Sequence, residues 1–298
     1  IGLPCRKPMH SQTSKFLLLD GATGTELDRR GVDVSLPLWS ARAMLEAPDV
    51  LLDVHRSYLD AGAGAICTNT FRTHERSLAK AGLVGHAERL TRAAVAIACA
   101  ARDELNQDAL VLGSVAPLED CYSPERAPDA ETCLGEHGQL IGHLVDAGVD
   151  LVLIETMCSA HEALAAAEAA DEVAPGNWAI SFCLAPGEPG VLLDGTLLAD
   201  LLPQLGRARF IGINCVAAPS MTGQVQHLNG LLHGDVPIAA YGNVGHPDDE
   251  RGWVNTDAID PDRYAEHAME WIEAGASITG GCCGTTPETT RAMSDQAT

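Results

Sequence analysis

The sequence contains few basic and few aromatic residues. Its 298 residues include 19 Lys and Arg against 41 Asp and Glu, a formal net charge of −22. Nucleic-acid binding needs a basic surface for the phosphates, so this balance argues against a nucleic-acid partner. Solubility is the simplest reason for the acidity. Only 4% of the residues are aromatic, so few side chains are available to contact a cationic ligand through a ring.

Long apolar runs and linker-like tracts are also missing. No apolar stretch approaches the roughly 18 residues of a membrane-spanning helix, so we expect no membrane segment. Residues 1–15 carry three basic residues but no apolar core of a signal peptide, so we expect a flexible tail there and one domain over 16–298. Ten cysteines in a chain of this length do not make a disulfide scaffold and favour a reducing, cytoplasmic compartment.

Short apolar runs alternate with longer amphipathic stretches. Several runs are continuously apolar, as in strands that are buried on both faces of a parallel sheet. The candidate strands are Phe16–Leu19, Ala65–Thr68, Leu110–Ser114, Leu151–Ile154, Trp178–Phe182, Phe210–Asn214, Val236–Ala240 and Ser277–Thr279. The helical patterns are Asp49–Ala61, Ala87–Leu105, Glu136–Ala147, His161–Glu172, Leu197–Leu205, Met221–Leu232, Asp262–Glu273 and a last helix near Pro287. Eight strand–helix pairs predict an α/β fold, a single (β/α)8 TIM barrel.

A doubly wound sheet is the alternative fold. It often carries a glycine-rich phosphate-binding turn after its first strand, but Asp20-Gly-Ala-Thr-Gly-Thr25 lacks the dinucleotide-binding spacing. In a barrel, functional residues gather at the C-terminal ends of the strands. Here polar residues or thiols follow most of the expected strands: Asp20, Thr68-Asn69-Thr70, Glu155-Thr156, Asn214-Cys215, Tyr241-Gly242-Asn243 and Cys282-Cys283. This distribution favours the barrel.

The segment Gly280-Gly-Cys-Cys-Gly-Thr285 is the most informative motif. Neighbouring side chains point in different directions in a helix or strand, so two adjacent thiols converge only on an unusual backbone, which glycine permits. Cys215 follows a different expected strand, so the thiols of Cys215, Cys282 and Cys283 can meet at one rim of the barrel. Taken alone, Cys215 would be interpreted as a core cysteine. Three thiolates with an open fourth position are typical of a catalytic Zn²⁺ site, which is our prediction.

Such a site suits a sulfur substrate. A thiol that enters the fourth position of the zinc loses its proton and becomes a nucleophile at neutral pH. The motif therefore favours alkyl transfer to a substrate thiol.

Five segments together resemble the zinc-dependent homocysteine S-methyltransferase family, over about Leu17 to Arg291. They are Asp20-Gly-Ala-Thr-Gly-Thr-Glu26, Thr68-Asn-Thr-Phe71, Glu155-Thr156, Gly212-Ile-Asn-Cys215 and Gly280-Gly-Cys-Cys-Gly-Thr285. The resemblance implies that a methyl group is transferred from a small donor to homocysteine, giving methionine. It also implies that Cys215, Cys282 and Cys283 bind zinc and that the homocysteine sulfur is the fourth ligand.

The same resemblance implies a homocysteine pocket. Its residues would be Asp20, Gly21, Ala22, Thr23, Thr68 and Glu155. The amides of the turn over 21–25 would receive the substrate carboxylate. Glu155 would pair with the substrate ammonium. As isolated residues, Asp20 fits a turn cap, Thr68 an ordinary strand residue and Glu155 a partner for a neighbouring Arg.

The donor side is less specified. Family donors include S-methylmethionine, S-adenosylmethionine, betaine and the methylcobalamin of a corrinoid protein. Leu38-Trp39-Ser40-Ala41 resembles the S-methylmethionine-dependent members, whereas Thr68-Asn-Thr-Phe71 resembles methionine synthase. Arg72 stands where betaine-dependent members have an aromatic residue, and a cation there would repel a quaternary ammonium. We therefore expect a sulfonium donor, with Trp39 as its aromatic contact.

Other residues and functions stay open. Asn214 is expected to shape the zinc loop, Tyr241 and Asn243 to line the donor side or simply to pack, and His246 is a weaker site candidate. The alternatives to a homocysteine enzyme are a different thiol or selenol acceptor, a non-catalytic zinc- or thiol-binding protein, and a redox protein with a Cys282–Cys283 disulfide. A methyl donor of another kind, betaine or a methylcorrinoid protein as partner, also stays open, as does a second copy of the chain in a homo-oligomer.

Overall fold

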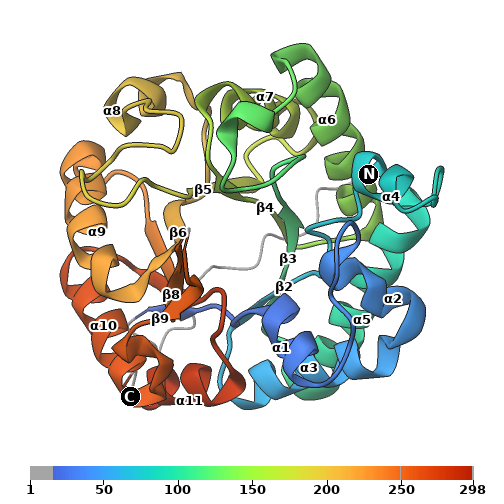
Figure 1. Ribbon diagram of the computed structural model, residues 1–298, viewed down its shortest axis with the longest axis horizontal. Coiled ribbons are helices and arrows are strands. Elements are labelled where there is room, and N and C mark those ends of the chain that lie inside the picture. Colours follow the sequence, from blue (N-terminus) through green and yellow to red (C-terminus); the bar gives the residue numbers. More distant parts are fainter. Residues whose placement is uncertain (1–15, 249, 297–298) are drawn as a thin grey trace.

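Eight parallel strands form a barrel that is surrounded by helices (Figure 1). The structure, a computed structural model, describes residues 16–248 and 250–296, so the tail expected over 1–15 lies outside the described residues. The strands are β1 (Leu17–Leu18), β2 (Ala65–Cys67), β3 (Leu110–Val115), β4 (Leu151–Met157), β5 (Trp178–Phe182), β6 (Ile211–Ala217), β7 (Ile238–Asn243) and β10 (Ile278–Gly281). They pair in the order β1-β10-β7-β6-β5-β4-β3-β2. A parallel bridge between Leu19 and Ala65 closes the ring, which confirms the predicted barrel and excludes the doubly wound sheet.

Helices follow the strands and cover the outside of the barrel. They are α1 (Thr23–Arg29), α2 (Ala43–Glu46), α3 (Pro48–Asp60), α4 (Glu75–Lys80), α5 (Ala87–Leu105), α6 (Ala130–Ala147), α7 (Ala160–Val173), α8 (Leu198–Leu201), α9 (Ala218–Leu232), α10 (Pro261–Glu273) and α11 (Pro287–Gln296). Short 3-10 turns lie at Trp39–Arg42, Pro124–Arg126, Leu202–Gln204 and Asp257–Ile259. Across 16–248 and 250–296, none of these helices is both long and apolar enough to span a bilayer.

Alternate residues of each strand fill two separate apolar layers. In β4, Leu151 and Leu153 pack in the barrel interior, whereas Val152 and Ile154 pack under the helices. This arrangement follows from the two-residue period of a strand. Because both faces are buried, the strands are apolar throughout, and this continuous pattern made them recognisable in the sequence.

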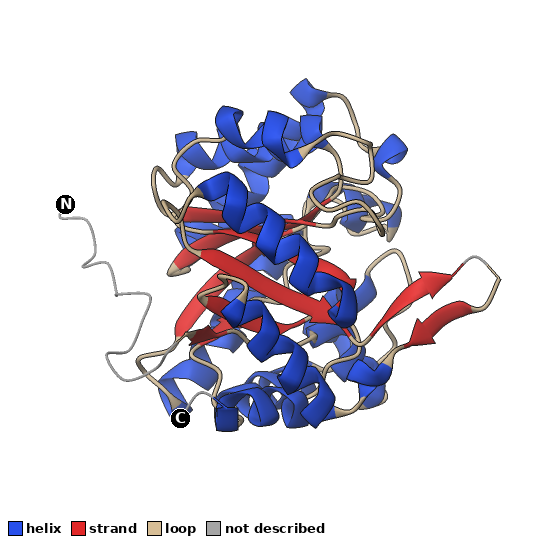
Figure 2. Cartoon of the chain, turned by 90° about the vertical axis from the view of Figure 1, so that its left-hand side faces the viewer, coloured by secondary structure: helices blue, strands red, loops and turns tan. Residues whose placement is uncertain are grey.

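Several element bounds differ from the predicted ranges by a few residues, and two differences are larger. The helix expected from Glu136 begins at Ala130, because the side chain of Asp129 accepts a hydrogen bond from the Thr132 amide (2.9 Å) and caps it. An unexpected antiparallel hairpin, β8 (Gly245–Asp248) and β9 (Gly252–Asn255), follows β7 and projects from the barrel (Figure 2). Its strands are short and mostly exposed, so the sequence carries no strong alternating apolar pattern there.

Candidate metal centre and substrate pocket

Two barrel strands carry irregularities where the predicted site residues lie. The register between β4 and β5 shifts between Ile154 and Met157, and the register between β6 and β7 shifts between Asn214 and Ala217. Within these bulges, Thr156 has φ 63° and Cys215 has φ 55°, values that are unusual for residues with a side chain. Bulges re-aim side chains next to functional sites. Here they set the directions of Glu155 and Cys215 at the barrel mouth.

The three predicted zinc ligands lie together. The sulfur atoms of Cys215, Cys282 and Cys283 are all within 4.8 Å of one another, and the Cys215 and Cys282 sulfurs are 2.9 Å apart. A tetrahedral zinc with bonds of about 2.3 Å separates its sulfur ligands by roughly 3.8 Å, so this cluster is of the right size. None of the cysteines in 16–248 and 250–296 forms a disulfide. The cluster can therefore hold a soft metal ion with three thiolates.

The thiols share hydrogen bonds. Hydrogen bonds from Cys215 and Cys282 hold the pKa of Cys283 well below its usual range. The pKa of Cys215 is raised by its hydrogen bonds with Cys282 and Cys283 and by burial. Of these two thiols, Cys283 therefore loses its proton more readily.

Asn243 connects the two segments that carry the thiols. Its amide nitrogen donates to the Cys215 carbonyl (3.0 Å), and its amide oxygen accepts from the Cys283 backbone N–H (3.0 Å). Further backbone hydrogen bonds run from Cys282 to the Gly242 carbonyl (2.8 Å) and from Val244 to the Cys283 carbonyl (3.0 Å). The ends of β6, β7 and β10 are therefore held in fixed relative positions.

Two carboxyl groups lie after β1 and within β4: Asp20 is buried, and Glu155 is partly buried. Asp20 accepts a hydrogen bond from the Cys67 amide (2.9 Å), and Glu155 accepts one from the Ser114 hydroxyl. Burial is the main cause that raises the pKa of Asp20 to about 8 and that of Glu155 to about 7. The negative charge of Glu155 adds to the rise for Asp20, and that of Cys283 adds to the rise for Glu155. No ion pair among the described residues involves either carboxyl group. A buried and a partly buried carboxyl group without an ion-pair partner are suited to a cationic ligand.

Thr68 and Asn214 connect the strands beneath this pocket. The Thr68 hydroxyl accepts from the Ser114 amide (3.1 Å) and lies 2.8 Å from the Thr70 hydroxyl, so it braces the residue that holds Glu155. The Asn214 side chain accepts from the Thr156 amide (2.9 Å) and donates to its hydroxyl (2.7 Å). Asn214 thus stabilises the β4 bulge, and its expected role in shaping the zinc loop stays a prediction.

The turn before α1 packs against the Cys282-Cys283 segment. The Ala22 amide donates to the Thr285 hydroxyl (3.1 Å), and the Gly284 amide donates to the Thr25 hydroxyl (3.0 Å). A side chain at Gly21 would lie 2.7 Å from the Thr285 hydroxyl oxygen, so this close approach requires glycine. The Ala22 amide is engaged by Thr285, and Thr23 begins the first turn of α1, where amides have no partner within the helix.

The remaining predicted residues lie in different places. Trp39 covers Gly24, where an added side chain would lie 2.5 Å from its indole nitrogen. Arg72 stacks on Phe71 at 5.4 Å and donates to the Glu119 carbonyl (2.8 Å). Tyr241 is buried, and its hydroxyl group is hydrogen-bonded to that of Ser181. His246 is exposed on the hairpin.

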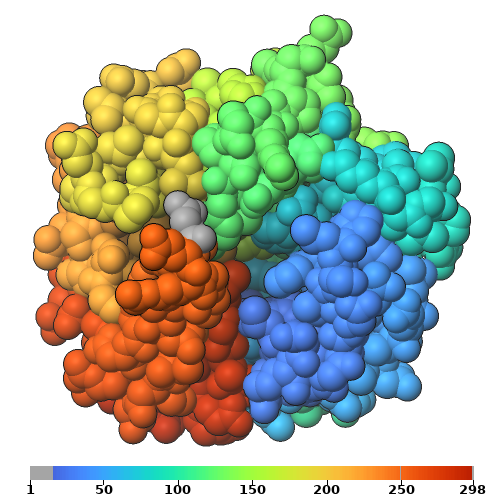
Figure 3. Space-filling view, viewed as in Figure 1, coloured from blue at the N-terminus to red at the C-terminus, as the bar shows by residue number. Residues whose placement is uncertain are grey.

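Tyr122 is a site residue that the sequence did not indicate. It lies in the loop after β3, packs against the buried group of Cys158, Cys183 and Cys215, and its hydroxyl oxygen lies 3.3 Å from the Asn243 amide nitrogen. No motif marks it, because the path of this loop depends on contacts with distant residues. Viewed as in Figure 1, the face of the molecule is hollowed at its centre, between segments coloured blue, green and orange-red (Figure 3).

Known proteins share this sequence and this fold. The family model described as "Homocysteine S-methyltransferase" matches residues 17–297. The homocysteine S-methyltransferase of Escherichia coli is 34% identical, with 91% of this chain and 92% of that protein covered. The selenocysteine Se-methyltransferase of Brassica oleracea is 29% identical, with 96% and 90% covered.

Solved structures agree with these relatives. The metallated form of the homocysteine methyltransferase MmuM from Escherichia coli superposes with a TM-score of 0.82 at 30% identity, covering 95% of this chain and 96% of that chain. The TM-score for the apo form is 0.73, with the same coverage. The barrel, the cysteine cluster and the full-length sequence match point to one conclusion: this chain belongs to the homocysteine S-methyltransferase family and is a methyltransferase.

Proposed function

We propose that this enzyme transfers a methyl group from a sulfonium donor to the thiol of homocysteine, at a zinc ion held by Cys215, Cys282 and Cys283. The observation that carries the proposal is the presence of a three-thiol cluster and two unpaired carboxyl groups in one barrel mouth. These groups are complementary to a molecule with both a thiol and an ammonium group.

The donor set fits zinc. Three thiolates with an open fourth position are typical of catalytic zinc, which when bound favours the deprotonated form of a fourth sulfur ligand at neutral pH. Asn243 holds the backbone of two of the three cysteines before any metal binds. The thiol cluster therefore requires little rearrangement on metal binding.

The carboxylate side would orient the acceptor. Asp20 and Glu155 would receive the homocysteine ammonium, and amides of the turn over 21–25 other than that of Ala22 would receive its carboxylate. Thr68 would act indirectly, by bracing Ser114 against Glu155. The homocysteine thiolate then attacks the methyl carbon of the donor. The carbon–sulfur bond of the sulfonium breaks, and the donor leaves as a neutral thioether, while the proton of the thiol passes to solvent.

A donor and acceptor screen tests the proposal. The zinc-loaded protein is incubated with homocysteine and S-methylmethionine, S-adenosylmethionine, betaine or methylcobalamin, and methionine is measured by mass spectrometry. We expect methionine from a sulfonium donor. No methionine from any donor would contradict the homocysteine assignment. If selenocysteine is methylated in preference to homocysteine, the acceptor is selenocysteine, the compound in the name of the Brassica relative.

We also infer that the enzyme acts in the cytoplasm, because a cluster of free thiols needs a reducing compartment. The homo-oligomer stays a prediction, which the molar mass from light scattering would test.

A further inference from the structure

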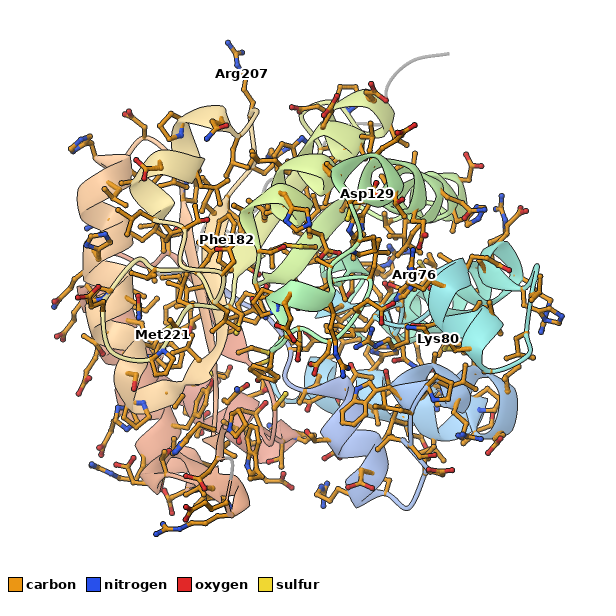
Figure 4. The ribbon with its side chains drawn as sticks, turned by 45° about the horizontal axis from the view of Figure 1, so that its top comes forward. Arg76, Lys80, Asp129, Phe182, Arg207 and Met221 are labelled. Carbon is orange, nitrogen blue, oxygen red and sulfur yellow. The ribbon has the colours of Figure 1, made fainter. Side chains whose placement is uncertain are left out.

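The loop that follows β3 is anchored by three independent contacts. Arg72 donates to the Glu119 carbonyl (2.8 Å). The Leu118 amide donates to the buried carboxylate of Glu162 (2.8 Å). On the outer side, Arg76 and Lys80 of α4, which are labelled in Figure 4, pair with the Glu119 carboxylate at 3.4 and 2.5 Å. These contacts, from three separate segments, fix the loop just before Tyr122.

The same loop directs Tyr122 toward the thiols. The Asp120 carboxylate accepts from the Tyr122 amide (3.1 Å) and from the Ser123 hydroxyl (2.9 Å), forming a tight turn. The Tyr122 side chain packs, as Cys282 and Cys283 do, against the buried group of Cys158, Cys183 and Cys215, and its hydroxyl reaches Asn243. The side chain is only partly buried, so part of its surface remains available to a ligand. An aromatic side chain is thus held next to the sulfur atoms by a rigid support.

The two other aromatic candidates are placed less suitably. Trp39 lies against Gly24 in the first turn of α1, the segment proposed to receive the substrate carboxylate. Tyr241 is 3% exposed, and its hydroxyl is engaged by Ser181. In a methyl transfer, the reacting atoms must come within about 3–3.5 Å of each other. The positive centre of the donor is therefore next to the acceptor sulfur, where Tyr122 lies.

We propose that Tyr122 forms the aromatic wall of the methyl-donor pocket and holds the sulfonium centre of the donor beside the acceptor thiolate. This assignment rests on the proposed function and replaces Trp39 as the expected donor contact. The ring face attracts a cation, and Asp120 adds a carboxylate on the same loop. Once the methyl group has left, the donor is a neutral thioether. It loses this attraction, which favours its release.

The ring and the hydroxyl of Tyr122 can be tested separately. Tyr122→Leu removes the ring, and Tyr122→Phe removes only the hydroxyl; Trp253→Leu, on the exposed hairpin, is the matched control. For Tyr122→Leu we expect the KM for S-methylmethionine to rise about 5- to 30-fold, the range of a desolvated cation–ring contact. Zinc content and homocysteine affinity should stay unchanged. Tyr122→Phe and Trp253→Leu should keep a donor KM close to that of the unchanged chain.

Several outcomes would overturn the assignment. The first is an unchanged donor KM in Tyr122→Leu, and the second is an equal change of the donor KM in the Leu and Phe variants. The third is loss of zinc from Tyr122→Leu, because it would show that Tyr122 only supports the thiols. Titration calorimetry tests the assignment without turnover. S-methylmethionine should bind the zinc-loaded Tyr122→Leu protein more weakly than the unchanged protein. Methionine, whose thioether sulfur carries no charge, should bind both proteins equally. An inactive unchanged chain that still binds the sulfonium through Tyr122 would contradict the proposed function but not this contact.

Discussion

The thiol side and the carboxylate side of the barrel mouth are built differently. On the thiol side, Asn243 and several backbone hydrogen bonds hold the cysteine segments in place without any ligand. On the carboxylate side, Asp20 accepts a hydrogen bond from the Cys67 amide, and Glu155 accepts one from the Ser114 hydroxyl. Burial raises the pKa of both carboxyl groups. The thiol side is thus preorganised. The carboxylate side is electrostatically incomplete until a cation binds.

The largest expected effect comes from removing a thiol. Cys282→Ser should abolish both zinc binding and methyl transfer, because two thiolates and a hydroxyl do not make the same soft site. Metal analysis of the purified protein and methionine formation measure the two effects. Cys183→Ser is the matched control, since Cys183 packs in the same cluster but does not belong to the triad. Full activity of zinc-free protein would disprove the mechanism.

Breaking the Asn243 contacts should weaken the thiol side without removing a ligand. Asn243→Ala is expected to lower zinc affinity about 10- to 100-fold, the usual effect of losing a group that orients metal ligands. A competition titration with a zinc-binding dye measures the affinity. Asn229→Ala, which loses a hydrogen bond to the Ala274 carbonyl on the outside of the barrel, should leave it unchanged. Equal losses in both variants would mean that general destabilisation, and not ligand placement, is responsible.

Changing a carboxyl group should affect the acceptor and spare the metal. Glu155→Gln is expected to weaken homocysteine binding by roughly 10- to 100-fold, because a charge-assisted hydrogen bond is lost. Zinc content should not change. The analogue 4-mercaptobutyrate lacks the ammonium group and should bind the variant and the unchanged protein alike. If the variant loses both ligands equally, Glu155 has no specific role toward the ammonium.

The affinity for homocysteine should rise with pH. Glu155 and Asp20 ionise with pKa values of about 7 and about 8 in the free protein, and only the ionised forms attract an ammonium. Binding should therefore strengthen several-fold as the pH increases from below to above these values. Deprotonation of the thiol adds its own pH dependence, which 4-mercaptobutyrate shares. The difference in binding free energy between homocysteine and 4-mercaptobutyrate therefore reports the ionisation of the two carboxyl groups. A difference that stays constant across this pH range would contradict the prediction.

The last effect concerns stability. The pKa of Asp20 is raised to about 8 in the folded protein but is about 4 in the unfolded chain. The folded form thus keeps a proton that the unfolded form releases, and the free energy of unfolding falls as the pH rises from about 4 to about 8. Asp20→Asn removes this loss, so its melting temperature relative to the unchanged protein should increase with pH. A pKa difference of about four units corresponds to about 5 kcal/mol, which is roughly 10 °C for a chain of this size. Calorimetry of the ligand-free protein at several pH values measures this; parallel curves would refute it.

The sequence predicted the barrel and the thiols because local patterns encode both. Continuous apolar runs such as Trp178–Phe182 indicate strands buried on both faces, and adjacent cysteines between glycines indicate an unusual turn. The roles of Asn243 and Tyr122 could not be predicted. Asn243 links backbone groups 28 and 40 residues away, and Tyr122 depends on a loop that Arg72 and Glu162 anchor. No local pattern records such long-range contacts, and the hairpin after β7 is too exposed to show one.

The contacts between the turn before α1 and the segment around Thr285 have a consequence for biosynthesis. Ala22 and Thr285 are 263 residues apart, and Cys215 and Cys282 are 67 residues apart. The ribosome therefore releases the first strand long before the partners that complete the mouth exist. A nascent chain that ends before β10 lacks two of the three thiols and an edge partner for β1. A metal ion held by all three thiols can bind only after translation has passed Cys283, so in the proposed enzyme zinc loading would follow closure of the barrel.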